Sequence, residues 1–192
     1  MATCRTAMVR LQNNSGRTIK VLSLRHQGRD GLRHDKQWSD VVAEATTPAV
    51  GVEYESGLAV TGADCWFLAW VYSDGKEVFF TDPNILAEEG ERAVEKIGRI
   101  VPDFVKRFDS AFTGVVGEEV IEAIADEVVT AARCAGWHCH PLTKAEFGRT
   151  MRISIEPNND VVFESRSRQS RTPAISTPLR RAADRPHLVK CE

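Results

Sequence analysis

The chain has 192 residues, of which 42% are hydrophobic, and its formal net charge is -2 at pH 7. This length suits one folded domain, and this hydrophobic content excludes a wholly disordered chain. The near-neutral balance gives no overall preference for nucleic acid or for another strongly charged partner.

The N-terminal stretch MATCRTAMVRLQNN has no apolar run long enough for a signal peptide or a membrane span. The five cysteines are an odd number without the spacing of a disulfide framework, and they lie at positions 4, 65, 134, 139 and 191. Reduced thiols in the cytosol are the simplest explanation. We therefore expect a cytoplasmic protein.

The first part of the chain predicts short strands separated by polar segments. Residues 18–26 predict a strand with Ile19 and Val21 on one face and Leu22 on the other. The polar residues 27–37 predict a loop. Residues 49–55 alternate between apolar and polar side chains, as a half-buried antiparallel strand does.

A strongly apolar strand is predicted at residues 65–72, CWFLAWVY. Both of its faces are apolar, so it is expected to lie centrally and to be covered on both sides. The Ser-Asp-Gly sequence at 73–75 predicts a hairpin turn, and residues 76–81 predict the returning strand.

Residues 84–135 change character and predict two helices. An apolar stripe at helical spacing begins at Ile97 and ends at Phe112. A second stripe follows within residues 118–133, and Gly136 predicts the end of that helix.

Strand character returns in a hairpin at 150–156 and 161–165. Residues 166–192 are rich in Ser, Arg and Pro and poor in aromatic residues, which predicts a disordered tail. Six Arg and one Lys against two acidic residues give this segment a charge of +5, which leaves -7 for the rest. Its arginines are suited to contacts with phosphates of nucleic acid or of lipid head groups.

Strands grouped before and after a helical segment favour a segregated arrangement over a doubly wound parallel sheet. The predicted fold class is therefore mainly β (α+β). We expect an antiparallel β-sandwich at residues 7–165, with a two-helix insertion between the strand groups at about 84–135.

Four stretches together resemble the family named "up-regulated in Daf-two", which has nematode and fungal members. The stretches are VRLQNNSGRTIKVLSLRH, then QWSDVV with VGVEYESGLAVTGADCWFLAWVYSDGKEVFFTDP, then EEVIEAIADEVV, and finally HCHPLTKAEFGRTMRISIEPNNDVVFESRS. The resemblance covers about residues 8–172. Cys65 departs from it by standing where the family usually has an aromatic residue. The resemblance implies an aegerolysin-like sandwich, a tendency to form dimers, recognition of membrane lipids and no known enzyme activity.

Cysteine and histidine gather in CAGWHCH, which holds Cys134, His138, Cys139 and His140. A structural zinc site uses about four ligands, usually from two separated pairs. Here all candidates share one short stretch, and neighbours such as His138 and Cys139 point apart on a strand. We favour a helix-to-strand connector over a metal site. The chain also lacks phosphate-binding glycine motifs, so no cofactor is expected.

Trp66, Trp70 and Tyr72 form an aromatic row on one face of the central strand, with Trp38 elsewhere. Such side chains suit a ligand surface or an interface, because one end is apolar and the other can hydrogen-bond. Packing between two sheets is the favoured interpretation, because this strand has no polar face.

The favoured function is a non-enzymatic binding or structural module that forms a homodimer or heterodimer and contacts membrane lipid or protein. No small-molecule substrate and no specific nucleic acid are indicated. One alternative is a hydrolase with a site assembled from distant residues such as His26, Asp64 and His140, for which those side chains have to meet at a concave surface. Another alternative is binding of nucleic acid or an anionic membrane by the tail.

Overall fold

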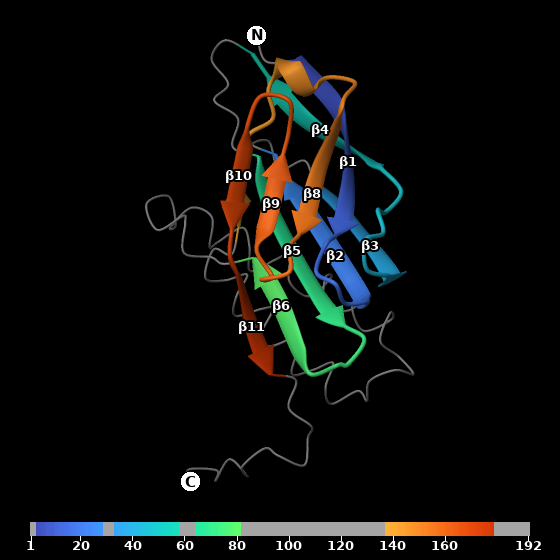
Figure 1. The fold of residues 1–192 in the computed structure, drawn as a ribbon. Coiled ribbons are helices and arrows are strands. Elements are labelled where there is room, and N and C mark those ends of the chain that lie inside the picture. Colours follow the sequence, from blue (N-terminus) through green and yellow to red (C-terminus); the bar gives the residue numbers. More distant parts are fainter. Residues whose placement is uncertain (1–2, 29–32, 58–63, 82–136, 179–192) are drawn as a thin grey trace, which may run out of the picture.

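The computed structural model describes residues 3–28, 33–57, 64–81 and 137–178, which form two facing β-sheets (Figure 1). One sheet has the strand order β10-β9-β8-β1-β4. The other has the order β11-β6-β5-β2-β3, and β7 also pairs with β5. The predicted mainly-β architecture is confirmed, while the helices predicted at 84–135 lie outside the described residues.

The five-stranded sheet has β1 between two partners. Its strands are β1 (Thr3–Asn13), β4 (Val50–Ser56), β8 (Thr150–Ile155), β9 (Val161–Glu164) and β10 (Gln169–Thr172). β1 is antiparallel to β4 but parallel to β8, with Met8 opposite Thr150. The prediction of a wholly antiparallel sandwich is therefore wrong at this pair. Alternating side chains fix which face a residue takes and leave the direction of its neighbour open.

The second sheet is built around β5, which is buried along almost its whole length, as predicted for residues 65–72. β5 is antiparallel to β2 on one side and to β6 on the other. The strands are β2 (Ile19–Gln27), β3 (Arg33–Val41), β5 (Cys65–Tyr72), β6 (Glu77–Thr81), β7 (His138–Cys139) and β11 (Ala174–Pro178).

A register shift in β2 overturns its predicted face assignment. The shift lies between Ile19 and Val21 in the pairing of β2 with β5. Ile19, Leu22 and Leu24 consequently belong to the core between the sheets. Ile19 and Val21 were predicted to share a face, which holds only for strict alternation, and one extra residue reverses that alternation.

Two segments predicted to be irregular form edge strands. β3 includes residues 33–37 of the predicted loop, and β10 and β11 lie inside the predicted disordered tail. β3 pairs with β2, and Arg25 lies opposite Asp35 with 2.6 Å between Nε and Oδ1. Edge strands are held by backbone pairing and commonly carry charged side chains, so an apolar pattern does not mark them. Residues 179–192 of that tail lie outside the described residues.

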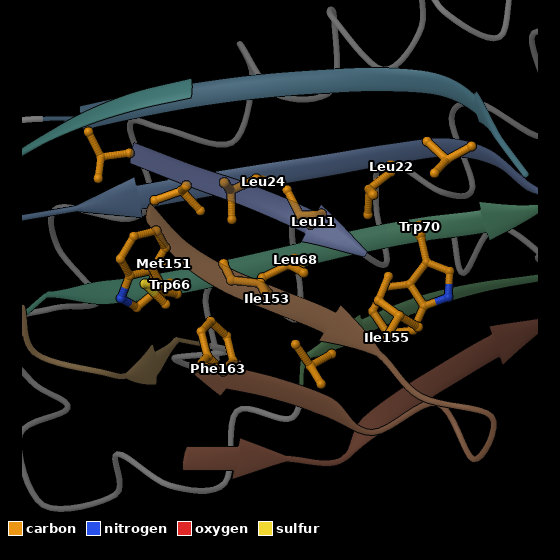
Figure 2. Close-up of a cluster of buried hydrophobic side chains, with 14 of the residues drawn as sticks. Leu11, Leu22, Leu24, Trp66, Leu68, Trp70, Met151, Ile153, Ile155 and Phe163 are labelled. Atoms are coloured by element: carbon orange, nitrogen blue, oxygen red, sulfur yellow. The ribbon is translucent and has the colours of Figure 1, made fainter. Parts of the chain in front are cut away.

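The core between the sheets brings together side chains from strands far apart in the sequence (Figure 2). β8 contributes Met151 and Ile153 from one sheet, and β5 contributes Trp66 and Trp70 from the other. Trp66 and Trp70 are 0% exposed. The strands before residue 82 therefore do close onto those after residue 150, as the alternation of apolar residues predicted.

Candidate functional site

An open hollow of about 550 Å³ lies on the five-stranded sheet and is dominated by arginines. The residues that line it come from β1, from the start of β8 and the residue before it, and from the end of β9 and the two residues after it. They are Arg10, Arg149, Thr150, Arg152, Glu164, Ser165 and Arg166. We call this feature the arginine hollow.

The strand pairing explains why the arginines gather there. Arg10 of β1 is directly opposite Arg152 of β8 in the parallel register. Both are exposed, because their neighbours in the strand face the core and successive side chains alternate between the faces of a sheet. Arg149 immediately precedes β8, and Arg166 follows β9. Two distant parts of the sequence thus place four guanidinium groups around one hollow.

Most of this positive charge is uncompensated. Arg152 Nε donates to Glu164 Oε2 at 3.0 Å, and its Nη2 donates to the same oxygen. Within the described part of the chain, Arg10, Arg149 and Arg166 have no ion pair. Four arginines against one glutamate leave the lining with a net charge of +3.

Guanidinium groups bind phosphate and carboxylate oxygens with two parallel hydrogen bonds. Three guanidinium groups that have no ion pair among the described residues, placed around an open hollow, therefore suit a multiply charged anion such as a phosphate ester. Because the hollow is open to solvent, salt is expected to screen this attraction strongly.

An exposed aromatic ring lies close in sequence to the hollow. Phe147 is 57% exposed and precedes Arg149 by two residues, just after the 3₁₀-helix η2 (Lys144–Glu146). The Arg5 guanidinium lies 5.1 Å from the centre of the Phe147 ring. Gly148 has a φ of 64°, in the left-handed region that glycine adopts readily, and its N–H donates to the Thr6 carbonyl oxygen. The turn that presents Phe147 is thus fixed to β1.

A second polar cluster lies between the sheets, at the start of β5 and around β7. His26 Nε2 hydrogen-bonds Asp64 Oδ1 at 3.0 Å, and the Leu142 N–H donates to Asp64 Oδ2 at 2.7 Å. The His140 N–H donates to the Asp64 carbonyl oxygen, and the Trp66 indole N–H donates to the His140 carbonyl oxygen. Asp64 thus ties β2 to the segment that follows β7.

The rings of His138 and His140 link this cluster to the other sheet. Ser170 Oγ lies 2.8 Å from His138 Nε2 and 2.6 Å from His140 Nδ1, while His140 Nε2 lies 3.1 Å from Ser165 Oγ. Both rings stack on Phe163. Among the described residues, His138 Nδ1 has no hydrogen-bond partner. A proton on Nε2 therefore satisfies His138 best, since it donates to Ser170.

Both imidazoles are neutral at pH 7. Burial lowers the pKa of His138 to about 4. The pKa of His140 is lowered to about 4, mainly by burial. The charge that His138 takes up when it is protonated, and the positive charge of Arg168, also contribute to this lowering of the His140 pKa. The two rings consequently act as hydrogen-bonding groups that hold the sheets together.

Glu146 closes the neighbouring turn. Burial by itself would raise the pKa of Glu146, but hydrogen bonds from Ser167 and Thr143 outweigh it, so that pKa is lowered. Its Oε2 accepts from the Thr143 N–H at 2.8 Å, and its Oε1 accepts from the Ser167 N–H at 2.9 Å. The carboxylate therefore ties η2 to the chain just beyond the arginine hollow.

The three residues named for a hydrolase do meet in this cluster. His26, Asp64 and His140 are linked through Asp64, but their exposed fractions are 0%, 3% and 0%. The ring of His140 faces Ser170 and Ser165 and does not hydrogen-bond the Asp64 carboxylate. These three residues therefore lie near one another, as the hydrolase alternative requires, but their side chains are buried.

The candidate metal ligands separate as neighbours on a strand do. His138 and His140 point toward Phe163 and Ser170, while Cys139 lies beside Cys65. In the described ranges no group of three or more His, Cys, Asp or Glu side chains is placed to hold a metal ion. Cys134 lies outside those ranges.

The aromatic row lies inside the protein, as the core-packing interpretation predicts. Trp70 stacks on Phe79 at 5.6 Å between ring centres, and the edge of Tyr72 meets the same ring at 5.2 Å. Trp38, on edge strand β3, is partly buried against the core. These residues therefore do not gather into one exposed ligand surface.

Sequence reasoning missed the arginine hollow, apart from Arg166 in the predicted tail. The signal that could have revealed it is an outward arginine on each of two strands, Arg10 and Arg152. That signal can be interpreted only when β1 and β8 are known to be neighbours, and these two strands are far apart in the sequence.

Two facing sheets, a sealed polar cluster and an open arginine hollow define this chain as a mainly-β domain with a surface suited to charged ligands. The chain belongs to the family described as up-regulated in long-lived daf-2, whose model matches residues 3–174. This confirms the resemblance read from the sequence. A search of curated proteins found no match.

Proposed function

We propose that this chain is a non-enzymatic binding module of its family and that it attaches to phosphate-bearing membrane lipids through the arginine hollow. The observation that carries the proposal is a set of three exposed arginines, Arg10, Arg149 and Arg166, which have no ion pair with any described residue and lie around one open hollow. Anionic lipid surfaces attract such residues at about 1 kcal/mol for each Lys or Arg near the surface.

Burial of the histidine cluster supports binding over catalysis. A hydrolytic group has to reach its substrate, and the buried His26, Asp64 and His140 are occupied in holding the sheets together. The arginine hollow offers hydrogen-bond donors and positive charge, and among the described residues that line it the one carboxylate, Glu164, is paired with Arg152. These are properties of a site that holds an anion.

The exposed ring of Phe147 favours a membrane over nucleic acid or a soluble phosphate. A phenylalanine at a lipid interface buries apolar surface in the membrane while neighbouring arginines contact phosphates. In the described residues no helix has the length and apolar character needed to cross a membrane. Attachment at the lipid surface is the mode that the hollow and this ring support.

The proposal includes a dimer in the cytoplasm. The dimer follows from the family resemblance, and each sheet has edge strands with which a second copy or a related chain could pair. The cytoplasm follows from the cysteine usage of the sequence. Size-exclusion chromatography with light scattering measures the first, and fractionation of cells that express the tagged chain measures the second.

The test is sedimentation of the full chain with vesicles. Vesicles of phosphatidylcholine are compared with vesicles that also contain phosphatidic acid or phosphatidylserine, at low and at physiological salt. We expect binding only to the anionic vesicles, with strong weakening by salt. The double variant R149Q/R166Q should reduce the partition constant roughly 30-fold, which corresponds to about 2 kcal/mol for two arginines.

Arg171→Gln is the matched control, because Arg171 is exposed but paired with Asp160. Phe147→Ser should weaken binding to vesicles and leave the binding of inorganic phosphate unchanged, which separates a lipid from a soluble anion. Equal binding to neutral vesicles would contradict the proposal, as would an unaltered R149Q/R166Q variant. Tighter binding to duplex DNA than to anionic vesicles would favour a nucleic-acid ligand instead.

A further inference from the structure

Two cysteines face each other across the edge of the central strand. Cys65 is the first residue of β5 and Cys139 is the second residue of β7, and the two are directly opposite in the antiparallel register. Their sulfur atoms lie 3.7 Å apart, with one thiol donating to the other. Both side chains are partly buried.

The strand geometry permits a disulfide between them. Directly opposite residues of an antiparallel pair have Cα atoms about 4.5 to 5.5 Å apart, and disulfides span Cα separations of about 4.4 to 6.8 Å. The two sulfur atoms would have to approach to about 2.05 Å, which side-chain rotation can supply without a change of register. Trp66 and His138 form the next pair of this ladder and keep the register in place.

We propose that Cys65 and Cys139 form a reversible thiol–disulfide site, oxidised by a low-molecular-weight disulfide such as glutathione disulfide. The thiolate of one cysteine attacks a sulfur of the small disulfide and releases one thiolate, which leaves a mixed disulfide. The thiolate of the other cysteine then attacks the protein sulfur and releases the second small thiolate. The two protons lost by the cysteines go to the two released thiolates, so the cysteines are oxidised and the small disulfide is reduced.

The disulfide would link β7, a short strand whose residues contact the other sheet, covalently to β5. β7 has two residues, and its ladder is with β5. It positions the ring of His138, and the chain just after it positions His140, whose contacts with Ser170 and Ser165 reach the other sheet. A covalent bond at Cys139 would hold this bridge in place when the sheets begin to separate.

The disulfide would also close a long loop, because its two cysteines are 74 positions apart. A crosslink of that length removes much conformational freedom from the unfolded chain. The oxidised protein is therefore expected to unfold at a temperature about 10 °C higher than the reduced protein. This inference does not depend on the proposed lipid binding.

The test equilibrates the full chain with glutathione buffers of increasing oxidising strength, traps the thiols and maps the peptides without reduction. We expect a Cys65–Cys139 crosslink that dithiothreitol reverses, together with the higher unfolding temperature. Both should disappear in Cys65→Ala and Cys139→Ala and persist in Cys4→Ser, which alters an exposed cysteine of β1.

Reduced Cys65 and Cys139 in the most oxidising buffer would overturn the inference, as would crosslinks of either cysteine to a different partner. If an alanine variant does not fold, the crosslink map of the unaltered chain still decides the question. An oxidised protein with no change in unfolding temperature would refute the fastening role of the bond.

Discussion

Acidification is expected to destabilise the fold through His138 and His140. In the unfolded chain these imidazoles take up protons near pH 6.5, whereas in the folded chain each does so near pH 4. Between these values the unfolded state holds more protons, so the stabilisation is complete above about pH 6.5 and falls as the pH drops toward 4. The full shift corresponds to about 3 kcal/mol for either histidine. The two losses do not simply add, because a charge on one ring lowers the pKa of the other.

Urea unfolding at several pH values between 7 and 4 measures this loss. Glu146 does not contribute to the change in stability above about pH 4.5. The lowered pKa of its carboxyl group stabilises the fold at pH values above the ordinary carboxyl pKa of 4.5, and this stabilisation is lost only at lower pH. His140→Gln should reduce the dependence on pH between about 6.5 and 4.5, while His34→Gln, which alters a half-buried ring on β3, should reduce it less. A free energy of unfolding that stays constant across this range would refute the reasoning.

Three further predictions concern stability. Asp64→Ala should cost about 3 to 5 kcal/mol in urea unfolding, because it leaves a buried histidine nitrogen and the Leu142 N–H without their acceptor, while Asp64→Asn should cost less. Phe163→Ala should cost about 3 to 5 kcal/mol, since this ring is 0% exposed and supports both imidazoles, and a smaller loss would argue against the stacking. Removal of residues 169–192 should lower the thermal midpoint further than removal of 179–192, because only the longer truncation removes β10 and β11; equal midpoints would contradict that role.

The sequence predicted those strands that bury an apolar face. Residues 49–55 and 65–72 match β4 and β5 closely, because alternation and a doubly apolar strand leave few other arrangements. Edge strands β3, β10 and β11 escaped because backbone pairing holds them and their side chains are largely polar. The register shift between Ile19 and Val21 was not predicted, because no residue type in this stretch indicates it.

The two polar clusters were predictable to different degrees. His138 and His140 drew attention as a cluster within one short stretch, yet Ser170, which contacts both rings, comes from the segment predicted to be disordered. The arginine hollow needs the pairing of β1 with β8, which only the fold establishes. Local sequence patterns therefore identified the two histidines, whereas the contacts of these histidines and the arginine hollow depend on pairing between distant strands.

The parallel pairing of β1 with β8 also joins two strands that are synthesised at well-separated times. β1 emerges from the ribosome well before its neighbour β8, which begins only at Thr150, so one side of β1 has no strand partner from β8 until residues 150–155 have been made. Contacts this distant in sequence close slowly, and an unpaired strand is prone to join other chains. A newly made chain thus depends on β8 to cover this side of β1.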